Sequence, residues 1–203
     1  KKTRKNIAFA KLNNCESSAN FFPSSVKHSI NKWIIFETIN LNKEVNNALN
    51  SFRFNDASYY LYSHIWSKFC DWYIEFSKPL FSGLDEEVKL ETQQTYAWVF
   101  EQCLIMLHPF MPFITEEIWL QKKDRKKLII HQTWPDFDKL TNIDNRPQQE
   151  INWLIDLIQE LFESPNLETI SSRSFNFSFS SAMRFIFISD PNEAPSALKD
   201  SLN

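Results

Sequence analysis

The chain has 203 residues, a formal net charge of −3 and a single glycine, Gly83. One glycine excludes glycine-rich phosphate-binding loops and dinucleotide-binding fingerprints, because both bring glycine backbone close to phosphate groups. It also disfavours a turn-rich all-β fold and favours helices joined by short polar or proline-containing turns. The three cysteines are widely spaced and form no C-x-x-C pair, so we expect reduced thiols and neither a disulfide framework nor a zinc site.

Apolar side chains recur at helical spacing through most of the chain. The pattern predicts helices at residues 4–20, 26–50, 55–78, 85–107, 112–121 and 151–162. We expect residues 23–25 to cap the second helix, Asn55 to cap the third and Lys78–Pro79 to end it. Short connections place neighbouring helices antiparallel, so the sequence predicts an up-down helical bundle.

The second half of the chain has a mixed pattern. Strand candidates occur at residues 128–131, 175–179 and 183–188, the second by strict alternation of apolar and polar side chains. The polar stretch 136–149 is typical of a linker. We therefore predict a mainly α protein with two parts. Residues 1–135 form the helical bundle, and residues 136–203 form a linker, a helix and a small α/β C-terminal appendage.

The stretch His108–Leu120 reads HPFMPFITEEIWL. Its first proline is expected to end one helix, and its second is suited to the first turn of the next. Glu116 and Glu117 are adjacent and point to different helix faces, so they cannot form a facing acid pair; they suit a helix start instead. We expect three aromatic side chains of this stretch to pack inside the bundle: Phe110, Phe113 and Trp119.

Positive charge gathers in two segments. Residues 1–11 and 122–127 together hold ten of the 22 basic residues but one of the 25 acidic ones. Such segments are compatible with phosphate contacts and equally with a solvated helix start and a solvated loop. The four histidines are scattered, and no metal-binding or catalytic spacing appears. The sequence therefore predicts a binding module. It shows no signal peptide or membrane-length apolar run, so we expect a cytoplasmic location.

Several motifs together resemble one family. They are HPFMPFITEEIW at 108–119, FRFNDASYYLYSHIWSKFCDWYIEFSKP at 52–79, KLNN at 11–14 and IHQTWP at 130–135. Over about residues 4–160 the chain resembles the helical anticodon-binding domain of class I aminoacyl-tRNA synthetases for branched aliphatic amino acids. The segment FCDWYIE, Phe69–Glu75, is most similar to the valine-specific branch. The family's catalytic motifs, H-I-G-H and K-M-S-K-S, are absent, and we expect the chain to be part of a larger protein.

The resemblance implies a role in tRNA recognition. The full-length enzyme would use ATP to attach valine to tRNA(Val), whereas this part would hold the anticodon region and require no cofactor or metal itself. Its expected partners are tRNA(Val) and the remaining domains of the same synthetase chain, which we expect to be a monomer. Two alternatives stay open: the isoleucine- or leucine-specific branch, and a helical protein-interaction module without RNA.

The resemblance also indicates where tRNA would bind, near the opening helix and the end of the third helix. For phosphate contacts we expect Arg4, Lys5 and Lys11, and for a base edge Asn14. Trp72 and Lys78 are further candidates. Trp72 lies on the apolar stripe of its helix, where core packing is the alternative, and Asn14 is also compatible with a solvated helix face.

Overall fold

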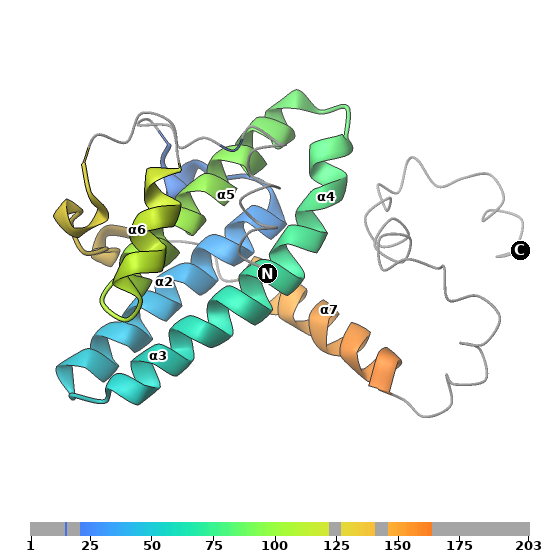
Figure 1. Ribbon diagram of the computed structural model, residues 1–203. Helices are drawn as coiled ribbons and strands as arrows, with labels where there is room; N and C mark the ends of the chain where they lie inside the picture. Colours follow the sequence, from blue (N-terminus) through green and yellow to red (C-terminus); the bar gives the residue numbers. More distant parts are fainter. Residues whose placement is uncertain (1–14, 16–20, 122–126, 141–145, 164–203) are drawn as a thin grey trace, which may run out of the picture. The chain divides into compact units, whose positions relative to one another are not determined.

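The structure is a computed structural model that describes residue 15 and residues 21–121, 127–140 and 146–163. The chain divides into two compact units, Lys1–Asn152 and Trp153–Asn203, and the helical bundle belongs to the first (Figure 1). The predicted helix at 4–20, apart from residue 15, and the predicted strands at 175–179 and 183–188 lie outside the described residues.

The described residues are mainly helical, as the sequence predicts. The main helices are α2 (Ser29–Asn50), α3 (Phe54–Ser63), α4 (Ile74–Ser82), α5 (Glu86–Leu107), α6 (Pro112–Leu120) and α7 (Arg146–Glu163). A π-helix, η2 (His64–Tyr73), joins α3 to α4. Short 3-10 turns occupy η1 (Pro23–Ser25), η3 (Ile129–His131) and η4 (Asp138–Leu140). Within the described ranges there is no strand.

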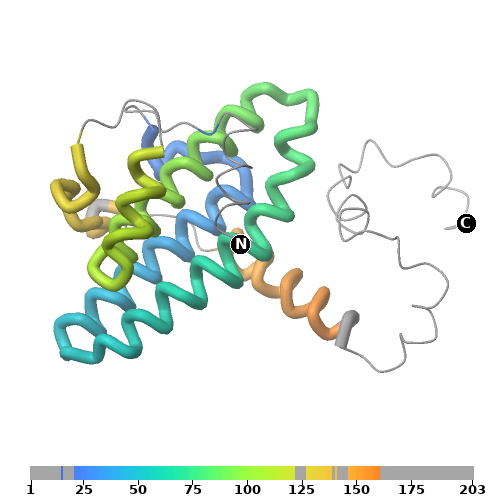
Figure 2. Tube along the Cα trace, in the orientation of Figure 1, coloured from blue at the N-terminus to red at the C-terminus, as the bar shows by residue number. Residues whose placement is uncertain are grey.

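The bundle is built around two antiparallel partners. Figure 2 shows α3, η2 and α4 following one another as one rod that turns at α4, and α3 and η2 pack against α2. Helix α5 packs against α2 and against α4, and α6 follows α5 through a short turn. The predicted helical bundle is confirmed.

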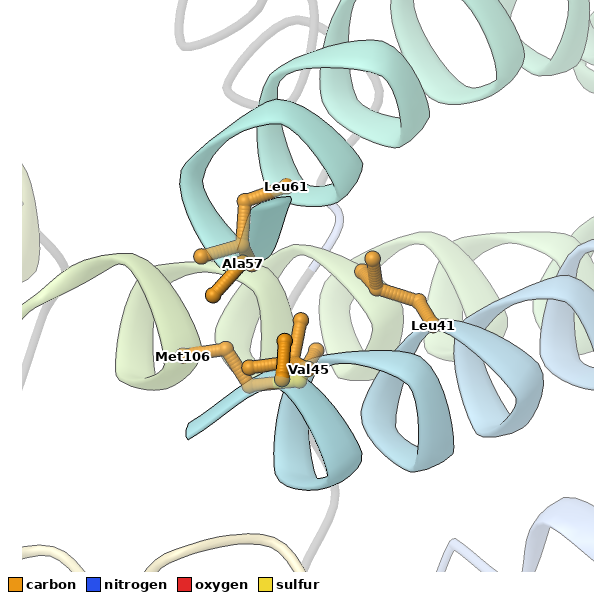
Figure 3. Packing of buried hydrophobic residues seen from close by; sticks show 6 residues of the cluster. Leu41, Val45, Ala57, Leu61 and Met106 are labelled. Atoms are coloured by element: carbon orange, nitrogen blue, oxygen red, sulfur yellow. The ribbon is translucent and has the colours of Figure 1, made fainter. Parts of the chain in front are cut away.

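Part of the core lies where α2, α3 and α5 meet (Figure 3). The buried residues of this cluster are Leu41, Val45 and Ala48 from α2, Ala57 and Leu61 from α3, and Met106 from α5. The α2 members follow the spacing that predicted this helix. Fully burying a side chain such as leucine or methionine stabilises the fold by about 1.5–3 kcal/mol, so these contacts hold the three helices together.

The predicted limits of the third helix were wrong. The helix begins at Phe54, with Arg53 at the N-cap position and no side-chain cap, so Asn55 lies inside it. Pro79 also lies inside helix, because α4 continues to Ser82. A proline removes one backbone donor without forcing the helix to end at that residue. The Ser82 hydroxyl lies 3.2 Å from the carbonyls of Lys78 and Pro79 and can donate to either, which helps to complete the last turn.

The amino end of α2 is capped differently from the prediction. Residues 23–25 form the separate turn η1, and His28 is the N-cap, with its Nδ1 accepting from the backbone of Ile30 at 3.4 Å. Glu91 reaches across from α5, and its carboxylate accepts from the backbone N–H groups of Lys27 at 2.8 Å and His28 at 3.0 Å. Donors left open at a helix start are thus satisfied by a neighbouring helix.

The predicted strand at 128–131 was wrong, because these residues contain the 3-10 turn η3. A short apolar run does not distinguish a strand from other buried segments. Two asparagines of α2 fix the chain beyond η3: Asn42 donates to the carbonyl of Pro135 at 3.1 Å, and Asn46 accepts from the Trp134 indole at 2.8 Å. The stretch predicted as a linker, 136–149, contains η4 and the start of α7.

The stretch 108–120 connects α5 and α6 as expected, with α5 ending at Leu107 and Pro112 starting α6. Glu116, however, lies beyond the first turn of α6, and both its carboxylate oxygens lie 3.2 Å from the backbone nitrogen of Ile129, which donates to them. Trp119 is buried and Phe110 is partly buried against the core, but Phe113 is 91% exposed. The packing role predicted for Phe113 was therefore wrong.

Helix α2 ends in a left-handed turn at Phe52, which has φ of 56°. The backbone nitrogen of Phe52 donates to the carbonyl of Leu49 at 3.0 Å, and that of Arg53 donates to Ala48 at 2.8 Å. These two bonds define a Schellman motif, in which glycine usually takes the left-handed position. Here the position holds a phenylalanine that is 80% exposed, at a backbone cost of about 1–2 kcal/mol.

Phe52→Gly is therefore expected to stabilise the protein. Glycine removes the left-handed strain, and its greater freedom in the unfolded chain takes back about 0.5–1 kcal/mol, so the free energy of unfolding should rise by about 0.5–1 kcal/mol. Urea denaturation measures the change. Phe52→Ala is the matched control: it removes the same ring but keeps a Cβ at positive φ, so it should not stabilise. Equal gains in both variants would mean that the ring, and not the backbone, carries the cost.

Candidate nucleic-acid interface

Four of the predicted tRNA-binding residues, Arg4, Lys5, Lys11 and Asn14, lie outside the described residues, so their roles stay predictions. The next residue, Cys15, is described and buried. Burial raises the pKa of the hydroxyls of Tyr73 and Tyr96, and the nearby Cys15 thiol raises both further. Cys15 therefore lies close to the end of η2.

Trp72 and Lys78 lie on the rod that η2 and α4 form. The Trp72 ring is half-buried, with its centroid 5.6 Å from that of Phe76, which agrees with the core-packing alternative. Lys78 is exposed, and its ammonium group lies 2.5 and 2.6 Å from the two carboxylate oxygens of Glu75. An ion pair of this kind contributes about 0–1 kcal/mol, and the predicted role of Lys78 in tRNA binding stays a prediction.

A second aromatic stripe lies on the rod, and it was not predicted from the sequence. Tyr59 is 66% exposed and Tyr62 is 58% exposed, and the Tyr62 ring stacks on Trp66 with centroids 5.2 Å apart. These positions are three and four residues apart, the spacing of neighbours on one helix face. The sequence contains this spacing, but the same helix also carries an apolar stripe through Leu61 and Phe69. That stripe was taken as the face of interest because it predicts the core.

The structure also reveals a buried charge. Glu37 on α2 is 3% exposed, and its Oε2 is ion-paired with Lys68 of η2. Its Oε1 accepts from the side-chain amides of Gln148 at 3.0 Å and Asn152 at 3.4 Å, in the first part of α7. Burial alone would raise the pKa of the Glu37 carboxyl, but the hydrogen bonds from Lys68 and Gln148 hold it below its usual range. Glu37 is thus ionised at neutral pH and joins three helices.

An open pocket of about 210 Å³ lies beside this charge. Its lining comes from α2, α3, η2 and the start of α7 and includes Glu37, Glu44, Tyr59, His64 and Lys68. Burial lowers the pKa of His64 to about 3, with the Lys68 charge adding to the effect, so the imidazole is neutral. No signal in the sequence placed these residues together, because the lining comes from three separate stretches of the chain, at 37–44, 59–68 and 148.

Within the described ranges, no cluster of three or more His, Cys, Asp or Glu side chains could hold a metal ion. No described helix has both the length and the apolar character needed to cross a membrane. The arrangement offers aromatic rings, amides and a polar pocket, which are groups that bind a partner.

Comparison with known proteins agrees with this description. Residues 31–174 match the model of the family described as anticodon-binding domain of tRNA ligase. Similar curated proteins include three called valine–tRNA ligase. That of Ruegeria pomeroyi is 47% identical over 66% of this chain and 13% of its own length. That of Agrobacterium fabrum is 44% identical over 74% of this chain and 16% of its own length. That of Caulobacter vibrioides is 40% identical over 75% of this chain and 17% of its own length.

The chain therefore spans less than one fifth of the length of each of these relatives. The family model covers α2 to α7 and so includes the bundle and the pocket. By this match, the chain belongs to the anticodon-binding domain family of tRNA ligases.

Proposed function

We propose that this chain is the tRNA-binding part of a valine–tRNA ligase and holds the anticodon region of tRNA(Val). The observation that carries the proposal is the family match over residues 31–174. The similar proteins named above are valine–tRNA ligases, which favours this branch over the isoleucine- and leucine-specific ones. The whole protein would use ATP to attach valine to its tRNA, acting as a monomer in the cytoplasm.

The described structure supports the proposal physically. Anticodon bases are single-stranded and can turn outward, where proteins bind them by stacking on aromatic rings and by hydrogen bonds to their polar edges. The rod carries exposed aromatic side chains, and Lys78 lies on the same rod. In the sequence, the predicted phosphate-binding residues Arg4, Lys5 and Lys11 precede Cys15, which lies near Tyr73 of η2.

The test is a titration of the protein with tRNA(Val) carrying its natural or altered anticodons, at two salt concentrations. We expect affinity to fall when the anticodon is altered and to fall with salt, by a factor set by the number of phosphates contacted. Binding that ignores both the anticodon and the salt would refute the proposal. It would favour the alternative of a protein-interaction module.

A pair of variants separates the two kinds of contact. Lys11→Ala is expected to weaken binding of all tRNAs alike and to reduce the salt dependence, because it removes a phosphate contact. Asn14→Ala is expected to reduce discrimination between anticodons, because it removes a base-edge contact. The measurement is affinity for natural and altered anticodons in each variant. The same effect from both changes would contradict these assignments.

A further inference from the structure

Two turns lie at the same end of the bundle. Helix α2 ends there, the rod of α3, η2 and α4 leads away, and α5 returns to it (Figure 2). The first turn, residues 51–53, joins α2 to α3, and the second, residues 108–111, joins α5 to α6. Phe110 of the second turn packs against the core cluster that contains Ala48 and Ala57, which flank the first turn. The two turns are therefore neighbours.

Apolar side chains from these turns and the adjoining helix starts are exposed to solvent. We call them the end face, and each is between 44% and 91% exposed: Phe52, Phe54, Met111, Phe113 and Ile114. The rings of Phe52 and Phe54 meet edge-on, with centroids 6.4 Å apart, so the first turn presents a preformed aromatic pair. Single exposed apolar side chains are ordinary, but apolar groups gathered in one place mark interaction surfaces.

The backbone at Phe52 indicates that this ring has a use. Its φ of 56° lies in the left-handed region, where glycine would be favoured. The ring gains little from burial within this chain, because it is 80% exposed. Strained residues persist where they serve a function, and a partner that covers the ring would supply the burial that the chain does not.

The charges at this end suit an apolar protein surface better than a nucleic acid. In the sequence, residues 50–56 and 108–114 contain one basic side chain, Arg53, one acidic side chain, Asp56, and one histidine. Arg53 and Asp56 form an ion pair, with Nη1 and Oδ2 3.2 Å apart. Binding of nucleic acid depends on several cations that neutralise phosphates, and the end face does not offer them.

The length of the similar ligases indicates what covers the end face. This chain spans less than one fifth of each of them. Domains of one polypeptide are held at an effective concentration of about 1 mM when a short linker joins them. An apolar face of moderate size is then sufficient for docking, although it would hold a separate protein only weakly.

We propose that the end face docks onto an apolar surface of another domain of the same polypeptide, with Phe52, Phe54 and Phe113 buried in the contact. The inference rests on the proposed function in one respect, that the chain is part of a longer ligase. It assigns the end face to assembly of that protein, and it requires no tRNA.

Hydroxyl-radical footprinting tests the inference by comparing the 203-residue chain with the full-length protein, both without tRNA. The oxidation rates of the three phenylalanines and the methionine of the end face should fall at least about threefold in the full-length protein, because side chains at the centre of an interface are packed as in a protein interior. Tyr62, 58% exposed on α3 and outside the end face, is the control and should oxidise equally in both. Unchanged rates at the end face, or an equal fall at Tyr62, would overturn the inference.

A substitution separates docking from folding. Phe113→Ser should leave the melting temperature of the 203-residue chain unchanged, because the ring is 91% exposed. In the full-length protein it should raise the oxidation rate of Met111 toward the value in the chain alone. Leu84→Ser is the matched control, since this side chain is fully exposed in the turn between α4 and α5, and it should leave Met111 protected. Equal effects of the two substitutions on Met111 would refute the docking role.

Other occupants of the end face give different results. If a second copy covers it, the 203-residue chain should self-associate in sedimentation and Phe113→Ser should abolish the association, which would refute the inference. If tRNA covers it, tRNA(Val) added to the 203-residue chain should protect the rings, which would also refute it. A full-length protein that protects the rings but binds no tRNA(Val) would refute the proposed function and leave this inference standing.

Discussion

Trp33→Ala is expected to lower the free energy of unfolding by about 3–5 kcal/mol, the range for removing a large aromatic side chain from a core. Trp33 is fully buried on α2. Its indole N–H donates to the Asn152 side chain at 3.0 Å, and its ring meets Phe76 edge-on with centroids 6.1 Å apart. The substitution leaves a cavity between α2 and α4 and removes the donor to Asn152.

Urea denaturation checks this expectation through a lower midpoint at unchanged slope. A loss of this size is a large part of the roughly 5–15 kcal/mol that stabilises a typical domain. Trp33→Phe is therefore included: it keeps a ring, loses the indole N–H and should cost less. Phe113→Ala is the exposed control, because this ring is 91% exposed, and its midpoint should hardly move. Equal effects at positions 33 and 113 would contradict the described core.

Lys68→Met is expected to destabilise the protein by about 2 kcal/mol at neutral pH. Removing one partner of a buried ion pair costs about 3–5 kcal/mol. The effect is smaller here because the Lys68 side chain is 44% exposed and solvent screens its charge. Glu37, 3% exposed, would keep the two amide donors from α7 and lose its counter-charge.

The pH dependence of this effect has a definite sign. In the unaltered protein the pKa of Glu37 is held below its usual value of 4.5, so its contribution to stability is present above that value and lost as pH falls through the folded-state pKa. In Lys68→Met, burial raises the pKa of the same carboxyl. It is then protonated earlier as pH falls, which relieves the penalty of a buried charge.

The difference in stability between Lys68→Met and the unaltered protein should therefore shrink from pH 7 to pH 4. Denaturation at several pH values measures it. Lys78→Met is the matched control, because its ion pair with Glu75 is solvent-exposed on both sides, with side-chain exposures of 45% and 31%, and its removal should cost at most about 1 kcal/mol. A difference independent of pH would rule out Glu37 as the source.

The sequence predicted the helices well where the signal is local. The apolar stripe through Ile30, Trp33, Ile34 and Val45 repeats at helical spacing, and all four side chains are fully buried in α2. The acidic start of α5 was also predictable, because Asp85 caps it by accepting from the backbone of Glu87 and Val88. Both features depend on residues within a few positions of each other.

Features set by distant residues could not be predicted. The burial of Glu37 depends on Lys68, Gln148 and Asn152, which are 31 to 115 residues away along the chain. The turn η3 was taken for a strand because its hydrogen-bonding partner, Glu116, lies on another helix. The candidate site could not be predicted for the same reason, because its residues are distant along the chain. The resemblance identified the family, which the comparison confirmed, but the pocket needs residues from positions 37 to 148 to be brought together.

The cap on α2 has a consequence for the order in which the bundle folds. Besides the His28 side chain, Glu91 holds this end of the helix by accepting from backbone N–H groups 63 and 64 residues away along the chain, and its Oε1 also accepts from Asn31 at 3.0 Å. Closing a loop of this length costs entropy before the contact is gained. We therefore expect the first turn of α2 to form late, after α5 has docked. In hydrogen exchange, the amides near residue 30 should lose protection together with those around residue 91, ahead of the α2 interior.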